Sequence, residues 1–423
     1  MSLYYHSVVI DKGKCNGRMR CMRACPTEAI RVRNGKAQIL QELCIDCGQC
    51  INVCPTGAII PLTDPLAESL KFKFRVAIPS PVVYSQFAGD IHPQKILSSF
   101  KKMGFDFAYD IAYACEWVGV AIQEYLKEYK GGRPLISNFC PTVIRLIQVK
   151  YPDLVELVVP IEVPREIVAR EAKHRLSKEF NVPMGEIGVI YIIPCPSKMV
   201  SIRQPAMKEK SWIDVAVSIP DIYKPLLVEM NSLSDRELDQ NMDMESMFGS
   251  GWAMFGRISQ SIGTESWVAV SGLNNVTKVF DDIENSKLRD IDFIEATACV
   301  ESCIGGPLTV ENVYVARSKA IRLENKYGRR LEEKREKILE LYQDGYFFLE
   351  KKLAPRPIRP FDPDIARAIK KMKKKEEIYK RLPKIDCGCC GSPSCIAFAQ
   401  DFVRGDVKMS DCIYKSKKQC QGP

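Results

Sequence analysis

The sequence has few histidines, no long apolar stretch and no recognisable secretion signal. Only three of its 423 residues are histidine, which disfavours zinc sites built from cysteine and histidine together. No run of eighteen apolar residues occurs, so the sequence predicts no membrane span. The first residues, Met1 to His6, lack the basic and then apolar pattern of a signal peptide. We therefore expect a cytoplasmic protein with no membrane partner.

Cysteine, by contrast, is abundant, with eighteen in the chain. Disulfides are not expected without a secretion signal, and the short spacings favour iron–sulfur clusters, as in the cytoplasm of an anaerobe. The net charge of +9 is no evidence for a nucleic-acid partner. A [4Fe–4S] cluster with four thiolates carries about −2, so four clusters would cancel about eight positive charges. We expect a near-neutral holoprotein, with a surface patch for an acidic electron carrier as the alternative.

Residues 1–63 contain two similar cysteine segments, as in a ferredoxin-like domain that binds two clusters. The second segment has spacings of two, two and three residues between Cys44, Cys47, Cys50 and Cys54, with a proline after the last. In the bacterial ferredoxin motif three cysteines bind one cluster and the fourth crosses to the other. The sequence therefore predicts a [4Fe–4S] cluster on Cys44, Cys47, Cys50 and Cys25. A zinc ribbon is disfavoured, because the repeated Cys-Pro-Thr-x-Ala-Ile segment is not a zinc pattern.

The first segment has an arginine, Arg18, where a second cysteine is expected. By the crossing rule only Cys15, Cys21 and Cys54 remain for the other cluster. Three thiolates suit a [3Fe–4S] cluster, or a [4Fe–4S] cluster with a ligand other than cysteine. The alternative is an empty site with Arg18 at the surface.

From residue 72 to 325 apolar, β-rich segments alternate with amphipathic ones. Residues 74–78, 189–193 and 267–270 are predicted to be buried strands, and 117–128 and 165–180 helices. This alternation is typical of an α/β fold with largely parallel sheets. Cys140, Cys195 and Cys299 each follow a strand-like segment. Ligand sites of such sheets lie at the carboxyl ends of strands, so we expect these cysteines to converge.

Three short motifs contain these cysteines: Asn138-Phe139-Cys140-Pro141, Pro194-Cys195-Pro196-Ser197-Lys198 and Ala298-Cys299-Val300-Glu301-Ser302-Cys303. Together they resemble the signatures of the [FeFe]-hydrogenases, which hold the H-cluster. That cofactor is a [4Fe–4S] unit bridged to a two-iron site with CO, cyanide and a dithiolate. The resemblance implies a hydrogenase-like α/β domain acting on H₂ and protons.

The resemblance also implies roles for single residues. Cys140, Cys195, Cys299 and Cys303 match the thiolates of the [4Fe–4S] unit, and Cys303 matches the one that also bridges to the two-iron site. Lys198 matches a lysine that hydrogen-bonds a cyanide ligand, a task for which a cation is suited. Pro79 and Ser80 look like the loop that contacts the other cyanide. We expect the adjacent Gly305 and Gly306 to let the backbone approach the cluster closely.

The motifs depart from those of the catalytic members of the family. Where these have a cysteine that passes protons to the cluster, this sequence has Phe139, whose ring carries no exchangeable proton. Losing such a group costs roughly 10²–10⁴ in rate. Three further positions differ, namely Ile193 for methionine, Ser201 for glutamate and Thr297 for methionine. This combination resembles the sensory branch of the family and implies low turnover.

The last hundred residues are predicted to form a charged helical linker, 326–380, and a small iron–sulfur module, 381–423. The linker is interrupted by prolines and is interpreted as solvated helices; its lysine run lacks the aromatics of a nucleic-acid patch. The module contains Cys387, Cys390, Cys395 and Cys412, and it resembles a [4Fe–4S] module of corrinoid iron–sulfur proteins and membrane electron-transfer subunits. Cys389 is expected to be an unliganded thiol, although it could compete for a place at the cluster.

Three functions fit the sequence. The leading one is a sensory, slow [FeFe]-hydrogenase that relays electrons to a redox partner such as ferredoxin, with a signalling kinase or phosphatase as the partner implied by the resemblance. The second is a low-activity, ferredoxin-linked hydrogenase whose proton path runs through Glu116, Glu124 or water. The third is an iron–sulfur scaffold that never receives the two-iron site. The first two require dedicated maturation enzymes for the two-iron site.

Overall fold

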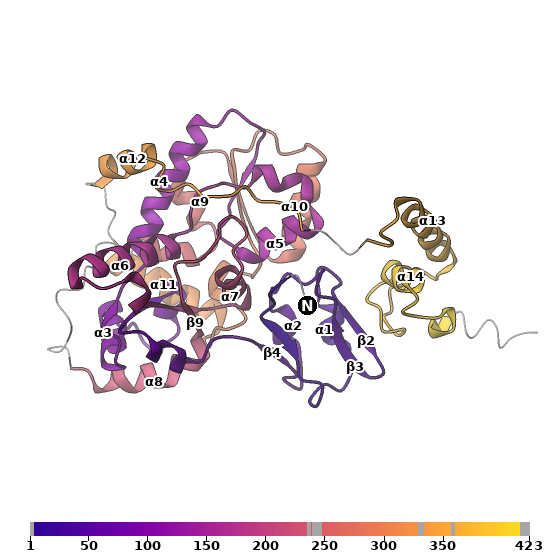
Figure 1. Cartoon of the computed structure of the whole chain (residues 1–423), viewed down its shortest axis with the longest axis horizontal. Coiled ribbons are helices and arrows are strands. Elements are labelled where there is room, and N and C mark those ends of the chain that lie inside the picture. Colours follow the sequence, from indigo (N-terminus) through magenta and orange to yellow (C-terminus); the bar gives the residue numbers. More distant parts are fainter. Residues whose placement is uncertain (1–3, 235–237, 239–247, 329–333, 357–359, 415–423) are drawn as a thin grey trace, which may run out of the picture. The chain divides into compact units, whose positions relative to one another are not determined.

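The computed structural model describes residues 4–234, 238, 248–328, 334–356 and 360–414, and its chain divides into two compact units (Figure 1). Unit 1 consists of Met1–Pro61 together with Arg356–Pro423, and unit 2 is Leu62–Pro355. Residues 329–333 and 357–359 of the predicted linker, and 415–423 of the predicted C-terminal module, lie outside the described residues. The two ends of the chain therefore belong to one unit.

The N-terminal part of unit 1 has the two-fold repeat of a ferredoxin. Two antiparallel pairs of strands are joined through two single-turn helices, α1 and α2. In the β2–β3 hairpin the turn residues Asn34 and Gly35 both have positive φ, as this tight turn requires. The elements are β1 (Val8–Ile10) with β4 (Ile59–Pro61), β2 (Ile30–Arg33) with β3 (Lys36–Ile39), α1 (Arg20–Arg23) and α2 (Gln49–Asn52).

The C-terminal part of unit 1 consists of α13 (Ile365–Arg381) and α14 (Cys395–Arg404), and it packs on β2. The buried carboxylate of Asp401 accepts hydrogen bonds from Arg31 Nε at 2.6 Å and from Arg33 Nη2 at 2.7 Å. The backbone amide of Val32 donates to the carbonyl of Gly391 at 2.9 Å. A buried ion cluster and a strand-edge hydrogen bond thus attach the C-terminal segment to the ferredoxin part.

Unit 2 is an α/β domain with two parallel sheets, as the sequence predicted. The larger sheet has the order β6-β5-β8-β9 and the smaller one β10-β11-β7. Every residue of β8 is buried, which explains its unbroken apolar sequence. The strand β10 is at an edge and only its Val270 is fully buried, so the expectation of a buried strand there was too strong. The strands are β5 (Phe74–Pro79), β6 (Phe107–Ala108), β7 (Leu135–Ile136), β8 (Ile187–Ile193), β9 (Val215–Ser218), β10 (Trp267–Ser271) and β11 (Phe293–Thr297).

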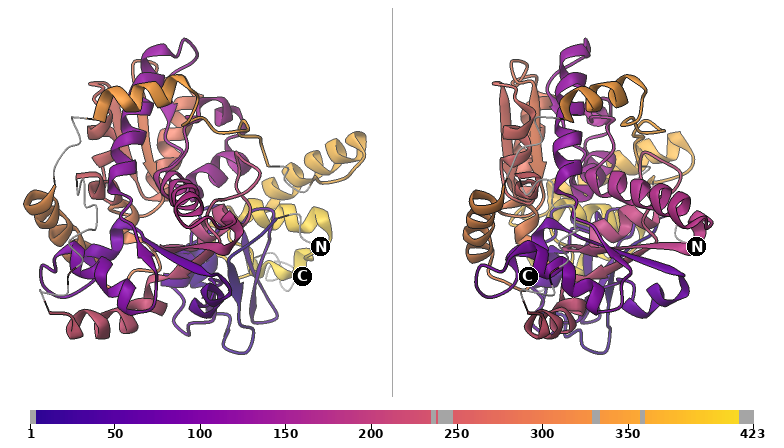
Figure 2. Two further views of the ribbon diagram at one scale, coloured as in Figure 1. Left: turned by 60° about the vertical axis from the view of Figure 1, so that its left-hand side comes forward. Right: turned by 90° about the vertical axis from the view of Figure 1, so that its left-hand side faces the viewer.

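Helices lie around both sheets of unit 2 (Figures 1 and 2). The predicted helical segments 117–128 and 165–180 fall within α4 and α6. Among the described residues, no helix combines the length and the apolar character needed to cross a bilayer. The helices are α3 (Pro93–Lys102), α4 (Ala112–Glu128), α5 (Pro141–Lys150), α6 (Pro164–Phe180), α7 (Pro196–Arg203), α8 (Ile219–Ser232), α9 (Arg257–Ile262), α10 (Leu273–Glu284), α11 (Val313–Tyr327) and α12 (Arg335–Gln343).

Candidate metal centres

The three cysteine motifs of unit 2 follow the carboxyl ends of three strands. Cys140 follows β7 and caps α5, Cys195 follows β8 and caps α7, and Cys299 follows β11. Each of the two capping cysteines precedes a proline at the first helical position, where a missing N–H does no harm. The N-terminus of a helix carries a partial positive charge, which stabilises negatively charged groups such as thiolates or an anionic cluster.

Contacts between these motifs bring their thiols into one region. Lys198 Nζ lies 3.3 Å from Cys303 Sγ, which joins the second motif to the third. Burial raises the pKa of the Cys140 thiol, as does its proximity to Cys303, whereas Lys198 and the backbone amide of Ala298 oppose the rise. The residue after Ala298 is Cys299, so all three motifs come together after the carboxyl ends of β7, β8 and β11.

Lys198 is almost completely buried, with 2% of its surface exposed. Burial disfavours its ammonium form, but Cys303 and Cys195 outweigh this effect and raise the pKa of Lys198. The ring of Phe139 lies 5.3 Å from Lys198 Nζ, and Trp252 packs edge-on against that ring at 5.8 Å between centroids. The cation is thus close to a thiol and to an aromatic ring, and it is shielded from water.

Pro79 and Ser80 lie at the end of β5 and are buried next to β8. The amide of Ser80 donates to the carbonyl of Ile192 at 3.2 Å, which continues the pairing of β5 with β8. Burial raises the pKa of Tyr191, while Lys198 and Ser80 are among the groups that oppose the rise. The loop therefore lies beside the same buried cation as the cysteine motifs.

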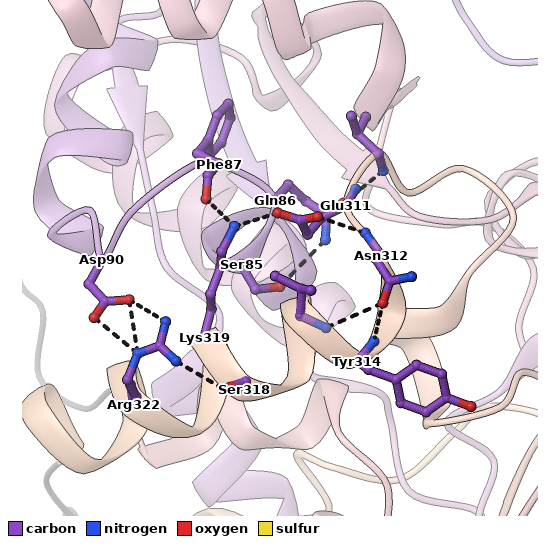
Figure 3. A network of polar contacts seen from close by, with 12 residues as sticks. Ser85, Gln86, Phe87, Asp90, Glu311, Asn312, Tyr314, Ser318, Lys319 and Arg322 are labelled. Carbon is purple, nitrogen blue, oxygen red and sulfur yellow. Dashed lines mark hydrogen bonds and ion pairs between the residues drawn. The ribbon is translucent and has the colours of Figure 1, made fainter.

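A polar network fixes the chain after this loop to the chain after Cys303 (Figure 3). Gln86 Oε1 accepts hydrogen bonds from the amides of Val310 at 2.8 Å and Glu311 at 3.1 Å. The buried Lys319 on α11 donates to the carbonyl of Phe87 at 2.7 Å and pairs with Glu311. Because these bonds join segments more than 200 residues apart, they position two walls of the site together.

The glycine pair after Cys303, Gly305 and Gly306, is required by close packing of the backbone. A side chain at Gly306 would place its Cβ 2.5 Å from the carbonyl oxygen of Pro194, and one at Gly305 would place it 2.1 Å from that of Val300. These glycines therefore permit a close approach of backbone to backbone, and the amide of Leu308 donates to Pro194 in the same contact at 2.9 Å. The expectation that they also let the backbone approach the cluster stays a prediction.

The other departures from the resembled motifs also lie around the site. Ile193 ends β8 and is fully buried, and Thr297 ends β11 with its hydroxyl 3.5 Å from the carbonyl of Val270. Ser201 donates to the carbonyl of Lys198 at 2.8 Å and accepts from Arg165 at 3.1 Å. Each of these side chains is satisfied by packing or by a hydrogen bond within the protein.

In unit 1 the two predicted ferredoxin sets line two separate cavities. One is lined by Cys25, Cys44, Cys47 and Cys50, as the crossing rule groups them. The other is lined by Cys15, Cys21 and Cys54 together with Arg18. The side chain of Arg18 is exposed, so it covers this cavity without filling it. The repeat is preserved around both, since the amides of Ala29 and Ala58 donate to the sulfurs of Cys25 and Cys54 at 3.2 and 3.3 Å respectively.

The predicted C-terminal set lines a third cavity, formed by Cys387, Cys390, Cys395 and Cys412. Gly388 and Gly391 in this loop both have positive φ. Cys389 is exposed and does not line that cavity. The geometry thus gathers each predicted set of thiols and leaves Cys389 outside.

Several residues of these sites had no signal in the sequence. Trp252 and Arg165 reach the surroundings of Lys198 from η6 (Phe248–Ala253) and from α6, segments without a cysteine motif. Asp401 contacts Arg31 across 370 residues of sequence. Spacing rules describe ligands that are close in sequence, and they contain no information on such distant neighbours.

Comparison with known proteins gives matches to three family models. Residues 73–268 and 260–307 match the iron-only hydrogenase large subunit, C-terminal domain. Residues 7–55 match the 4Fe-4S dicluster domain, and 382–414 match a model described as "Putative Fe-S cluster".

Among curated proteins, the chain is similar to the NADP-reducing hydrogenase subunit HndD of Solidesulfovibrio fructosivorans, with 21% identity over 55% of this chain and 46% of that protein. The chain therefore spans less than half the length of that relative. It is also similar to iron hydrogenase 1 of Clostridium pasteurianum, with 22% identity over 81% of this chain and 73% of that protein. A short match, 50% identical over 40 residues (10% of this chain and 9% of that protein), is to the corrinoid/iron-sulfur protein large subunit of Moorella thermoacetica.

Among solved structures, the chain resembles HydA(deltaEFG), a structure described as revealing stepwise [FeFe]-hydrogenase H-cluster assembly. The TM-score is 0.53 with 14% identity, covering 70% of this chain and 97% of that one. It also resembles an apo [FeFe]-hydrogenase HydA1 variant from Chlamydomonas reinhardtii, with a TM-score of 0.51, 14% identity and coverage of 70% and 98%. At this identity the likeness concerns the fold.

Proposed function

Because the chain belongs to the iron-only hydrogenase large-subunit family, we propose that it is a sensory [FeFe]-hydrogenase that splits or forms H₂ slowly. Splitting one H₂ releases two protons and two electrons. The iron–sulfur clusters that the cysteines of the chain would hold could accept these electrons, and water would take up the protons. The observation that carries the proposal is the buried Lys198, whose Nζ lies near both the thiol of Cys303 and the ring of Phe139.

The residues present fit an H-cluster. Cys140, Cys195, Cys299 and Cys303 would hold its [4Fe–4S] unit, and Cys303 would also bridge to the two-iron site. Lys198 provides a buried cation next to Cys303, which suits an anionic cyanide ligand. When bound, the two-iron site would supply the binding and heterolytic cleavage of H₂.

The side chains around this site then determine how slowly it works. Lys198 orients an anionic ligand, and Pro79 and Ser80 form the wall beside it. Phe139 and Trp252 exclude water, and neither ring accepts a proton at the position where catalytic relatives carry a thiol. A site that binds H₂ but exchanges protons poorly is suited to reporting H₂ and not to consuming it.

The clusters of unit 1 would supply the electron relay: Cys25, Cys44, Cys47 and Cys50 would hold one [4Fe–4S] cluster, and Cys387, Cys390, Cys395 and Cys412 would hold another. Cys15, Cys21 and Cys54 would hold a [3Fe–4S] cluster or a [4Fe–4S] cluster with another ligand. The redox partner is a ferredoxin or a similar carrier, and a signalling kinase or phosphatase would receive the signal. The two-iron site itself comes from maturation enzymes.

The decisive test is an infrared spectrum after anaerobic reconstitution with iron, sulfide and a synthetic two-iron precursor. Bands in the CO and cyanide region that shift reversibly under H₂ are expected. A protein fully loaded with [4Fe–4S] clusters but without such bands would favour the scaffold function instead. A buried cation next to Cys303 has no use in a scaffold, which is why we rank that function lower.

Turnover distinguishes a sensor from a ferredoxin-linked hydrogenase. Replacing Phe139→Cys restores a proton carrier, and we expect H₂ evolution to rise by up to roughly 10²–10⁴ when the rest of the proton path is intact. Phe139→Ala is the matched control, because it opens the same space without an acid or base. An equal rise in both variants would show that access and not proton transfer limits the rate. Robust ferredoxin-linked activity of the unaltered protein would contradict the sensory role.

A further inference from the structure

A cavity of about 70 Å³ lies in unit 2 next to the cysteine motifs, between α5, α6 and α7. It borders Pro141, which follows Cys140, and Ser201, which hydrogen-bonds the carbonyl of Lys198. A water molecule needs roughly 10–15 Å³ on this scale, so the cavity has room for about five water-sized groups. None of the predicted ligands or cyanide contacts lines this cavity.

The acidic side chains of this cavity are fully used by the protein. Glu166 accepts from Lys208 Nζ and from Ser211 Oγ, both at 2.7 Å, and from the amide of Trp212 at 2.9 Å. Glu162 accepts from Lys208 Nζ at 2.7 Å and from the amide of Val163 at 2.9 Å. Lys208 is therefore shared between two carboxylates, and each carboxylate also accepts a backbone hydrogen bond.

Arg165 makes no ion pair within 4.0 Å with a carboxylate of the described residues, although its charge helps to lower the pKa of Glu166. It is 6% exposed, and its Nη2 donates to Ser201 Oγ at 3.1 Å. Its Nε is buried, and no acceptor of the described residues lies within hydrogen-bonding distance. A buried guanidinium with an unused donor is costly unless an anion reaches it.

The remaining lining is apolar, with Ile144, Val163, Pro205, Met207 and Leu349 around the charged end. A guanidinium recognises a carboxylate by charge-assisted hydrogen bonds, and an apolar wall accommodates a short hydrocarbon tail. We propose that this cavity binds a small organic carboxylate of about two to four carbons, with its carboxylate on Arg165. This assignment does not depend on the reaction at the thiol site.

Occupancy of the cavity has a direct route to that site. Ser201 lies between Arg165 and the main chain of Lys198, with hydrogen bonds of 3.1 and 2.8 Å. A carboxylate on Arg165 competes for the guanidinium that now holds Ser201. The bound carboxylate would therefore change the position of helix α7, which carries Lys198.

The test is calorimetric titration of the full chain, reconstituted with iron and sulfide, with sodium butyrate at constant ionic strength. Butyramide, which has the same shape without the charge, is the ligand control. We expect saturable binding of butyrate, and binding of butyramide weaker by roughly tenfold to a hundredfold. A folded, iron-loaded protein that shows no saturable heat with butyrate, or that binds butyramide equally well, would overturn the proposal.

Two variants and a control localise the binding. Arg165→Gln removes the cation, and Ser201→Glu supplies an internal carboxylate next to it; both are expected to weaken butyrate binding at least roughly tenfold. Lys178→Gln makes the same charge change at an exposed position of α6 and should leave binding unaltered. If the Arg165→Gln protein does not fold, the Ser201→Glu protein still tests whether butyrate binds at Arg165. Unchanged affinity in a folded Ser201→Glu protein would refute the site.

Discussion

The two units of the chain differ in what their cores are made of. In unit 1 the hydrophobic cores include cysteines that are candidate metal ligands. These are Cys15, Cys21 and Cys50 in the ferredoxin part and Cys395 and Cys412 in the C-terminal part. In unit 2 a large hydrophobic cluster consists of aliphatic and aromatic side chains, and Cys303 is only partly buried against it. Unit 1 is thus built around its metal sites, whereas unit 2 holds its thiols in a fold that does not need them.

Removal of iron should therefore unfold unit 1 and leave unit 2 folded, and this is the largest effect we expect. Structural metal sites contribute their binding energy to folding, so unit 1 should unfold when chelator strips its clusters. Amide protection in β2 and β3 should fall by roughly a thousandfold or more, while that in β5 and β8 should remain. Hydrogen exchange followed by mass spectrometry measures both, with a mock-treated sample as control. An equal loss of amide protection in both units would contradict the proposed difference between their cores.

The second prediction concerns the ion cluster of unit 1. Asp401→Asn leaves the buried Arg31 and the half-buried Arg33 without a full charge partner, which should cost about 3–5 kcal/mol of unit 1 stability. Denaturation followed by the visible absorbance of the clusters reports this loss. All four tryptophans of the chain lie in unit 2, so their fluorescence should show an unaltered transition. Asp406→Asn, at an exposed position nearby, should change neither signal.

The third prediction is a pH dependence confined to unit 2. Burial raises the pKa of Asp110 from 3.8 to about 6, so the folded state binds this proton more tightly than the unfolded one. The resulting stability is present below pH 3.8 and is lost as pH rises to about 6, at a cost of about 3 kcal/mol. Asp110→Asn should remove this slope and stabilise unit 2 near neutral pH. Tryptophan-monitored unfolding at several pH values measures it, with the exposed Asp290→Asn as control.

The smallest effect is expected from completing the incomplete ferredoxin half. Arg18→Cys places a fourth thiol at the cavity of Cys15, Cys21 and Cys54. The change should add about one iron per chain if a [3Fe–4S] cluster becomes a [4Fe–4S] cluster, with little effect on unit 2. Iron analysis and electron paramagnetic resonance measure the change, and Lys12→Cys is the exposed control. The same iron content in both variants would mean that the position of Arg18 does not face a cluster.

Much of this arrangement could be predicted from local sequence. The unbroken apolar segment of β8 required a central parallel strand, and the structure has one. Cysteine spacing grouped thiols that the structure places around common cavities, and their iron binding stays a prediction. The rest depends on tertiary neighbours. Nothing near Phe139 in sequence indicates Trp252, and nothing near Arg165 shows that the carboxylates beside it are taken by Lys208.

The attachment of Asp401 to Arg31 also has a consequence for biosynthesis. The two residues are 370 positions apart, and a ribosome adds roughly 5–20 residues per second. The arginine is therefore made roughly 20–75 seconds before its partner, and all of unit 2 is synthesised in between. During that interval the newly made ferredoxin part presents a bare strand edge and two unpaired cations. Iron delivery or a chaperone that acts early would reach this end of the chain while it is still open.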